Sequence, residues 1–320
     1  MSITILCHKL ISSWWVDILL REKAVLIENR SPFFVYFLNL DLHYDSINGK
    51  HIFAIRHLLF LLELLMKTSV QIVIASHKPY WMPSDPIYYP LHVGSALYPG
   101  FGFPGDNTGD NISAKNPNYC ELTGLYWAWK NLDADYIGLV HYRRHFSNGN
   151  LFRSKKDQVI SSSELEPLLQ QSQIILPKPR HYWIETNYSQ YAHAHHAIDL
   201  DTTRAILSEK YPDYLPTYDS VMRRTYGHRF NMFIMRRDYL DAYCLWLFDI
   251  LFALESRLDI TNYSTNDARV FGFVGERLLD VWLEKNNYSY TELPYVFLEN
   301  QHWVKKAFAF LSRKLKGFYK

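Results

Sequence analysis

The sequence predicts an α/β fold in which helices cover the faces of a sheet. Short β-branched runs of strand length alternate with longer segments of helical spacing, the order expected of layered α/β proteins. The 320 residues are 48% hydrophobic and 21% charged, which is typical of a folded globular protein and excludes a disordered or coiled-coil chain. No internal repeat is visible, and no apolar run reaches the roughly 18 residues that a membrane span needs.

The first clear strand comes late in the chain. Residues 70–76 form a β-branched run typical of a buried strand, and Pro79 ends it. Residues 1–65 have apolar runs but no clean period. We therefore expect a functional domain over residues 66–300 and an N-terminal appendage over residues 1–65, with an ordinary helical subdomain as the alternative.

The next elements follow a long turn-rich stretch. Residues 82–118 are rich in glycine and proline, and residues 100–105 spell G-x-G-x-x-G. That spelling neither follows a strand nor opens a helix, so we do not expect a dinucleotide-binding loop. Helical spacing then covers residues 120–130, and a second buried-strand pattern covers residues 136–140.

The C-terminal half continues the alternation. Pro177 ends a short apolar run that reads as a third strand. The remaining predicted elements are that strand at 174–176, helices at 188–209, 238–257 and 273–285, and a strand at 230–235.

Charge is unevenly distributed. The chain carries a formal net charge of +2, yet residues 301–320 hold six cations and no acid, so the remainder is net −4. A mildly acidic body is not expected to bind nucleic acid, which requires basic charge spread over a folded face. The apolar residues interleaved with the six cations predict a basic amphipathic helix on an anionic membrane surface. A helix docked on the body is the alternative.

The three cysteines, Cys7, Cys120 and Cys244, are more than a hundred residues apart. This spacing excludes a zinc site built on thiolates and makes a disulfide framework untenable. A reducing, cytosolic compartment fits best.

Cationic side chains follow the first two strands. His77 and Lys78 follow strand 70–76, while His141, Arg143 and Arg144 follow strand 136–140. Ligands of open α/β sheets gather beyond the carboxyl ends of the strands, and arginine suits phosphate oxygens. We predict a diphosphate ligand here; arginines that pair with core carboxylates are the alternative.

Short polar side chains and histidines are the candidate sugar ligands. Asp106, Asp110 and Asn111 lie in a turn-rich loop that could bind sugar hydroxyls or be merely solvated. His193 and His196 would share a face of one helix at i, i+3 spacing. They would bind acceptor hydroxyls or line the helix surface; a metal pair is less favoured because no third ligand is evident.

Two carboxylates are the candidate catalytic groups. Glu276 or Asp267 would serve as the general base or stabilising carboxylate. For Glu276, a helix-terminal carboxylate favoured by the macrodipole is the alternative. Asn231 would border the sugar pocket.

The sequence resembles a bacterial family of capsular and exopolysaccharide glycosyltransferase-like proteins, long catalogued as a domain of unknown function. The resemblance covers about residues 70–300, and residues 1–65 have no counterpart in it. It rests on the segments 109–113, 116–123, 126–130, 136–139, 141–144, 191–196, 231–233 and 276–278.

The resemblance implies a GT-A-like fold with a mixed, mostly parallel sheet. It implies a hexosyltransferase that moves a galactose-type sugar from a UDP-linked donor to a lipid-linked glycan, peripherally on the cytoplasmic face of the membrane. Most such folds hold a divalent ion, Mn or Mg, through Asp-x-Asp just after a central strand. Here Asp133 and Asp135 have that spelling but precede their strand, so we expect cationic side chains to neutralise the diphosphate, and metal dependence stays open. The rival interpretation is a non-catalytic carbohydrate-binding or scaffold protein of a polysaccharide assembly complex.

Overall fold

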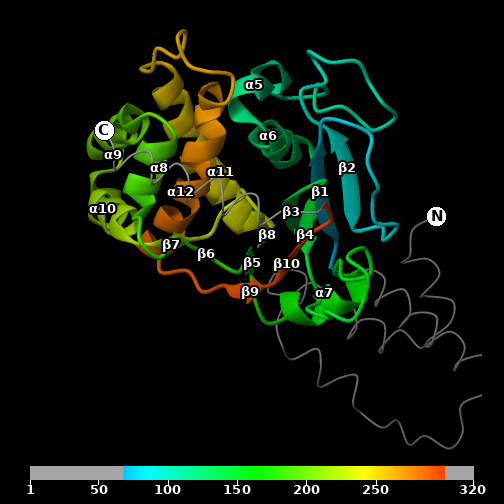
Figure 1. Ribbon diagram of the computed structural model, residues 1–320. Coiled ribbons are helices and arrows are strands. Elements are labelled where there is room, and N and C mark those ends of the chain that lie inside the picture. Colours follow the sequence, from blue (N-terminus) through cyan, green and yellow to red (C-terminus); the bar gives the residue numbers. More distant parts are fainter. Residues whose placement is uncertain (1–67, 300–320) are drawn as a thin grey trace, which may run out of the picture. The chain divides into compact units, whose positions relative to one another are not determined.

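A computed structural model describes residues 68–299, and all of these except Thr68 belong to the compact unit Ser69–Lys320. The predicted N-terminal appendage and basic C-terminal helix lie outside the described residues. Within them, the helices gather mainly on one side and the large sheet on the other (Figure 1). No described helix is both long and apolar enough to cross a membrane.

Eight strands form the large sheet. Its main path runs β10-β4-β3-β8-β5-β9, while β1 pairs with β3 and β2 with β1. The bounds are β1 Val70–Ser76, β2 Tyr88–His92, β3 Tyr136–His141, β4 Arg144–Phe146, β5 Ile174–Pro177, β8 Phe233–Arg236, β9 Thr291–Leu293 and β10 Tyr295–Phe297. A separate hairpin pairs β6 Arg180–His181 with β7 Tyr226–Gly227.

Six of these eight described strands point in one direction. β1, β2 and β3 are parallel, and β8 is antiparallel to both β3 and β5. β9 is parallel to β5, and β10 and β3 are each antiparallel to β4. The predicted mixed, mostly parallel sheet flanked by helices is therefore confirmed.

Alternating residues of the central strands fill two cores. Val73 and Ala75 join the core under α6, α11 and α12, while Ile72 and Ile74 join the core that includes α7 residues. A strand buried on both faces reads as a continuous apolar run, which is why β1 and β3 were recognisable in the sequence.

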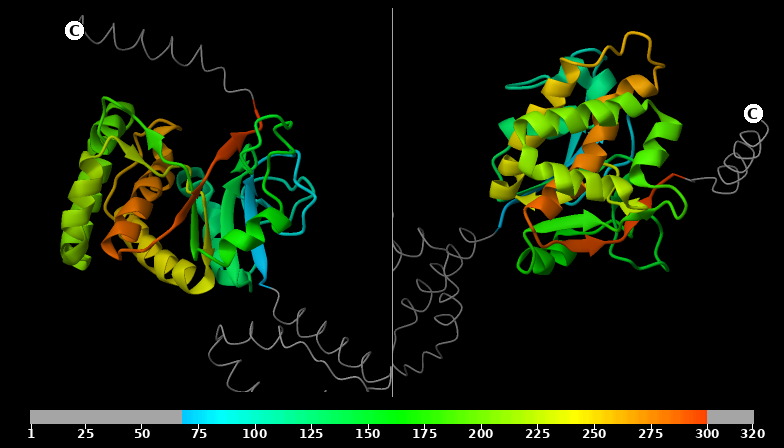
Figure 2. Two further views of the ribbon diagram at one scale, coloured as in Figure 1. Left: turned by 90° about the horizontal axis from the view of Figure 1, so that it is seen from below. Right: turned by 90° about the vertical axis from the view of Figure 1, so that its left-hand side faces the viewer.

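The helices also follow the predicted order. They are α5 Asn116–Tyr119, α6 Leu122–Asn131, α7 Ser162–Leu169, α8 Asn187–Ala194, α9 Ala197–Lys210, α10 Leu215–Arg223, α11 Arg237–Glu255 and α12 Val270–Lys285. Single-turn 3-10 helices lie at Ser113–Lys115, Pro212–Tyr214 and Asp267–Arg269. Figure 2 shows α8 to α12 packed as one helical layer.

The predicted single helix over 188–209 is wrong. It is two helices, because the backbone at His195 is extended (φ −141°, ψ −154°) and His196 caps α9. His193 and His196 therefore do not lie on a common helix face.

Candidate active site at the strand ends

The carboxyl ends of β1 and β3 lie side by side. Ala75 is in register with His141, so the residues that follow each strand emerge at one edge of the sheet. The His77 and His141 ring centroids are 6.4 Å apart. Lys78 Nζ and Arg143 Cζ lie 5.2 Å and 5.3 Å from the centroid of one ring, Tyr142. We call His77, Lys78, His141 and Arg143 the strand-end cluster.

The positive charge of the cluster comes from its lysine and arginine. Burial and neighbouring cations lower the pKa of His77, and they lower the pKa of His141 well below its ordinary value. Both imidazoles are therefore neutral at pH 7 and can offer hydrogen bonds rather than charge. Lys78 Nζ and Arg143 Nη1 share one internal carboxylate, Glu299, at 3.7 Å and 3.5 Å. A single acid leaves the two cations with a net positive charge.

Arg144 extends the positive site inward. Its Cζ lies 3.7 Å from the Phe230 ring centroid, and its buried Nε has no hydrogen-bond partner in the described part of the chain. Burial lowers its pKa to about 10, and nearby Glu276 and Glu121 oppose that shift. It is therefore still charged at pH 7. A buried donor without a partner is energetically costly, so this nitrogen is suited to donate a hydrogen bond to a ligand oxygen.

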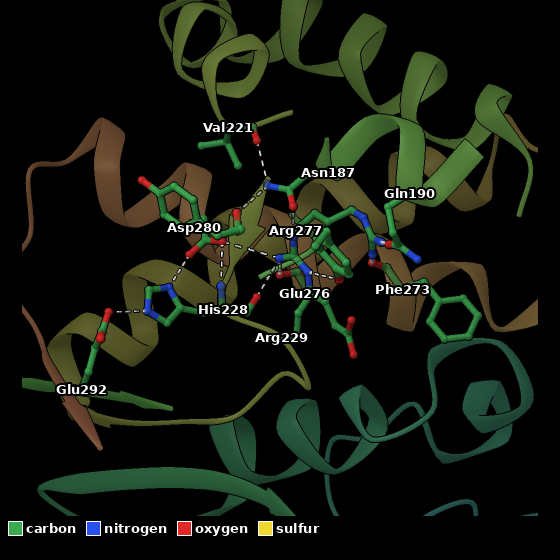
Figure 3. Close-up of polar contacts among 12 residues, drawn as sticks. Asn187, Gln190, Val221, His228, Arg229, Phe273, Glu276, Arg277, Asp280 and Glu292 are labelled. Carbon is green, nitrogen blue, oxygen red and sulfur yellow. Dashed lines mark hydrogen bonds and ion pairs between the residues drawn. The ribbon is translucent and has the colours of Figure 1, made fainter. Parts of the chain in front are cut away.

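Two carboxylates, Glu121 and Glu276, lie within electrostatic reach of Arg144. Burial, and then repulsion from Glu276, raises the pKa of Glu121, although Asn231 Nδ2 donates to it at 2.8 Å. The Glu276 carboxylate has no hydrogen-bond or ion-pair partner among residues 68–299, and Figure 3 shows it turned away from the polar network behind it. We call these two residues the carboxylate pair.

Strained backbone gathers around the carboxylate pair. Three of the five described non-glycine residues with positive φ are Cys120 (54°), Phe230 (81°) and Asn231 (50°). Such conformations persist only where surrounding contacts impose them, and they cluster at functional sites. Arg269 Nε lies 3.0 Å from Cys120 Sγ, so a further cation adjoins this strained segment.

Two glycines let α12 approach these strained residues. A Cβ at Gly275 would lie 2.9 Å from Leu122 Cδ1 and 3.4 Å from Asn231 Oδ1. A Cβ at Gly272 would lie 3.4 Å from Cys120 Cβ, and the Gly272 carbonyl accepts from Asn231 Nδ2. The spacing Gly272-x-x-Gly275 thus sets the carboxylate pair against Asn231.

The other predicted carboxylate, Asp267, lies in a different cluster. Its Oδ1 is 2.9 Å from His195 Nδ1, and its Oδ2 accepts from Ser264 Oγ. Hydrogen bonds from Ser264 and His195 lower its pKa. Asp267 therefore fastens its own loop to the turn between α8 and α9.

The histidines predicted as acceptor ligands are separated. His193 Nδ1 lies 2.7 Å from Glu185 Oε1. The His196 ring stacks on Tyr263 at 4.1 Å. Because α8 ends between them, they form no joint site.

The polar loop before the 3-10 helix Ser113–Lys115 is held by hydrogen bonds within the loop and its neighbours. Asp106 is fully buried and accepts from Gly94 N, Ser95 N and Oγ, and Ser113 Oγ. Burial leaves Asp106 no surface for a ligand in this conformation. Asn111 closes a local turn through hydrogen bonds with Gly109 and Ser113. Asp110 accepts a hydrogen bond from the Tyr126 hydroxyl at 3.2 Å.

The Asp-x-Asp spelling lies at the opposite edge of the sheet. Asp135 Oδ2 accepts from Ser69 N at 3.0 Å and Ser69 Oγ at 3.1 Å, and thereby joins the starts of β1 and β3. The described residues bring together no group of three His, Cys, Asp or Glu side chains suited to a metal ion.

A second group of arginines lies behind the site, in the helical layer (Figure 3). Arg229 donates to Asn187 Oδ1, to the Tyr182 hydroxyl, and to the carbonyls of His228 and Glu276, and it pairs with Asp280 at 3.5 Å. Arg277 donates to Phe273 O and Gln190 Oε1 at 2.8 Å and 2.7 Å. We call Arg229, Arg277 and the groups that accept from them the buried arginine network.

Two hollows of the described surface lie elsewhere. One is lined by residues of α9 and α10 and the other by Asp280 and its neighbours. In the first, Arg204 is already paired with both oxygens of Asp219. At the strand ends, by contrast, Lys78 and Arg143 outnumber their one internal carboxylate.

Residues 71–287 match the family model of a domain of unknown function, DUF4422. The chain belongs to the DUF4422 family. A solved structure described as the apo form of the bifunctional glycosyltransferase WbbM is similar to this DUF4422 chain, with 34% identity and a TM-score of 0.68. The match covers 72% of this chain and 46% of that one, so it spans less than half of the solved protein. No curated protein matches.

The sequence analysis assigned no role to two residues of the candidate site, Glu121 and Arg269. Glu121 lies in the segment 116–123, and Arg269 lies two residues after Asp267. Glu121 is followed by an apolar helical pattern and ordinarily reads as a solvated helix-start acid. Its link to Asn231 arises only when α6, α12 and the segment before β8 pack together.

Proposed function

We propose that this protein is a glycosyltransferase that takes a nucleotide-sugar donor. The observation that carries the proposal is the strand-end cluster, in which Lys78 and Arg143 exceed their one internal carboxylate. The similarity of the chain to one part of a bifunctional glycosyltransferase supports it. The finer proposal is a galactose-type sugar, a UDP-linked donor and a lipid-linked capsular or exopolysaccharide acceptor at the cytoplasmic face of the membrane.

In this proposal the leaving diphosphate binds where Glu299 now contacts Lys78 and Arg143. The diphosphate replaces that carboxylate, and Lys78 and Arg143 stabilise the negative charge that develops on it as the sugar–phosphate bond breaks. Neutral His77 and His141 donate hydrogen bonds, and Arg144 meets the diphosphate from the inner side. Asn231 would border the sugar.

Glu276 is the proposed reacting carboxylate. Its oxygens lack a partner among the described side chains, and Arg144 lies within electrostatic reach. It either accepts the proton of the acceptor hydroxyl or stabilises positive charge on the sugar ring. Glu121 holds Asn231 in place and, through its raised pKa, can carry a proton beside Glu276.

The test is thermal stabilisation by nucleotide. A ligand at a hundredfold excess over its dissociation constant stabilises the folded state by about 2.7 kcal/mol. We expect UDP to raise the midpoint of unfolding and a panel of UDP-sugars to identify the donor by turnover. Stabilisation reduced in Arg143→Ala but kept in Arg236→Ala would locate the nucleotide. Absence of any nucleotide effect would favour the rival, a non-catalytic carbohydrate-binding protein.

A further inference from the structure

The loop between β4 and α7 presents two large apolar side chains to solvent. Leu151 is 83% exposed, and Phe152 is fully exposed, the most exposed large hydrophobic side chain among residues 68–299. Exposing both on one tip forgoes the free energy that their burial would give. An apolar tip of this kind indicates that something covers it in the working protein.

Local hydrogen bonds hold the tip in shape. Asn150 N donates to Asn148 Oδ1, and Phe152 N donates to Asn150 Oδ1, both at 3.1 Å. Asn148 Nδ2 also donates to Glu164 Oε1 at 3.0 Å, which ties the loop to α7. The exposure of Leu151 and Phe152 is therefore a built feature of the loop.

Three cations follow the apolar tip in the sequence. Arg153, Lys155 and Lys156 come after Phe152, and within residues 148–157 the one acid, Asp157, accepts from Ser154 Oγ at 2.7 Å. Two exposed apolar side chains next to three cations match the boundary between acyl chains and anionic headgroups. A protein partner would call for a wider apolar patch, and the mildly acidic body argues against nucleic acid.

The loop also lies beside the end of the described chain. Lys155 Nζ donates to Glu299 O at 3.2 Å, and Figure 2 shows the loop next to the end of β10. The sequence continues directly into the segment with six cations and no acid. The loop therefore lies beside the last described residue of the chain.

We propose that the loop of residues 148–157 inserts Leu151 and Phe152 into an anionic bilayer surface. The three cations contact lipid phosphates, and the insertion fixes which side of the body faces the membrane. Through Glu299, that side is the one that carries Lys78 and Arg143. The insertion itself is independent of the proposed function. Only its role, to present the strand ends to a lipid-linked acceptor, rests on that function.

The test uses the full chain and vesicles of phosphatidylglycerol mixed with phosphatidylcholine. The double variant Leu151→Ser/Phe152→Ser should partition about tenfold less, on the scale of burying two apolar side chains partway into the interface. The matched control is Leu245→Ser, because Leu245 is 61% exposed on α11. Equal partition of the double variant and the control would overturn the proposal.

A second measurement separates the loop from the tail. Phe152→Trp should gain fluorescence quenching by brominated lipids that Leu245→Trp does not gain. No added quenching at position 152 would also overturn the insertion. Thermal stabilisation by UDP is measured on the same variants and should be unchanged. The nucleotide proposal would fail instead if UDP did not stabilise the unmodified chain, so the two proposals are tested separately.

Discussion

The strand-end cluster and the buried arginine network both concentrate positive charge, yet they differ in how that charge is met. Arg229 donates to four internal acceptors and pairs with Asp280, whereas Lys78 and Arg143 share one partly exposed carboxylate. Burying an arginine is tolerable when its donors are satisfied, so Arg229 is a structural residue. Arg277 is satisfied at both Nη atoms, while its buried Nε has no hydrogen-bond partner among the described residues. Cations that outnumber their partners at a sheet edge are instead available to a ligand. The number of internal hydrogen-bond and ion-pair partners, and not the presence of arginine, therefore separates a structural cation from one that can bind a ligand.

Arg229→Met should give the largest effect and breaks the structural side of the comparison. It leaves Asn187 Oδ1 without its donor and removes the cation that pairs with Asp280, at a cost of about 3–5 kcal/mol in the free energy of unfolding. Urea denaturation measures this loss. Arg236→Met, at an exposed ion pair with Asp238, is the control and should cost under about 1 kcal/mol. Comparable losses in both variants would contradict the structural role of Arg229.

Glu276→Gln sharpens the comparison, because this residue belongs to both regions. Its backbone carbonyl accepts from Arg229, while its carboxylate points away from the network. We expect the rate of sugar transfer to fall about a hundredfold or more with the unfolding midpoint unchanged. Asp267→Asn, placed in the separate His195 cluster, should keep most of the activity. If Asp267→Asn proved the more damaging, the assignment of the reacting carboxylate would be reversed.

Arg143→Ala tests the ligand-binding side. The exposed ion pair with Glu299 contributes under about 1 kcal/mol, so folding should be nearly unaffected. The affinity for UDP should fall about tenfold, the scale of one charge-assisted hydrogen bond to phosphate. Titration calorimetry measures the change. Unaltered affinity would move the diphosphate away from the strand ends.

Glu299→Gln offers a change of opposite sign at the same place. It removes the internal anion that competes with the diphosphate, so UDP should bind a few-fold more tightly. The same titration measures it against the unmodified chain. Weaker binding would mean that Glu299 assists the nucleotide.

The smallest predicted effect is a pH dependence of opposite sign in the two regions. Burial alone would lower the pKa of His228, but Asp280 and Glu292 outweigh it and raise that pKa above 6.5. The stability that His228 contributes is therefore present below pH 6.5 and lost as the pH rises through the higher folded value. The pKa of His141 is lowered, so its contribution is present above pH 6.5 and lost as the pH falls below it.

Unfolding measured from pH 5.5 to 8.5 checks these signs. His228→Gln should flatten the stability profile above pH 6.5, and His141→Gln should flatten it below. Profiles that flatten on the same side would contradict the assignment of a charged His228 and a neutral His141.

The sequence predicted the fold better than the site because burial leaves a local signature. β1 and β3 are apolar runs, and their cationic ends follow from strand direction alone. β9 and β10 span three residues each, too few to show a period, and β2 carries Pro90, which suits a strand paired only with β1. The apposition of Glu121, Asn231 and Glu276 depends on positive φ at Cys120, Phe230 and Asn231. Tertiary packing imposes those angles, and no periodicity records them.

Glu299 has one more consequence. Its side chain contacts Lys78 and Arg143, while its carbonyl accepts from Lys155 in the loop proposed to meet the bilayer. One residue thus contacts both the proposed nucleotide site and the loop proposed to insert into the bilayer. Since thermodynamic linkage is reciprocal, any bias that lipid places on this joint returns as an equal bias of nucleotide on lipid affinity. Binding of the donor nucleotide-sugar and binding to the membrane would then be thermodynamically coupled, and a measurement of either would report on the other.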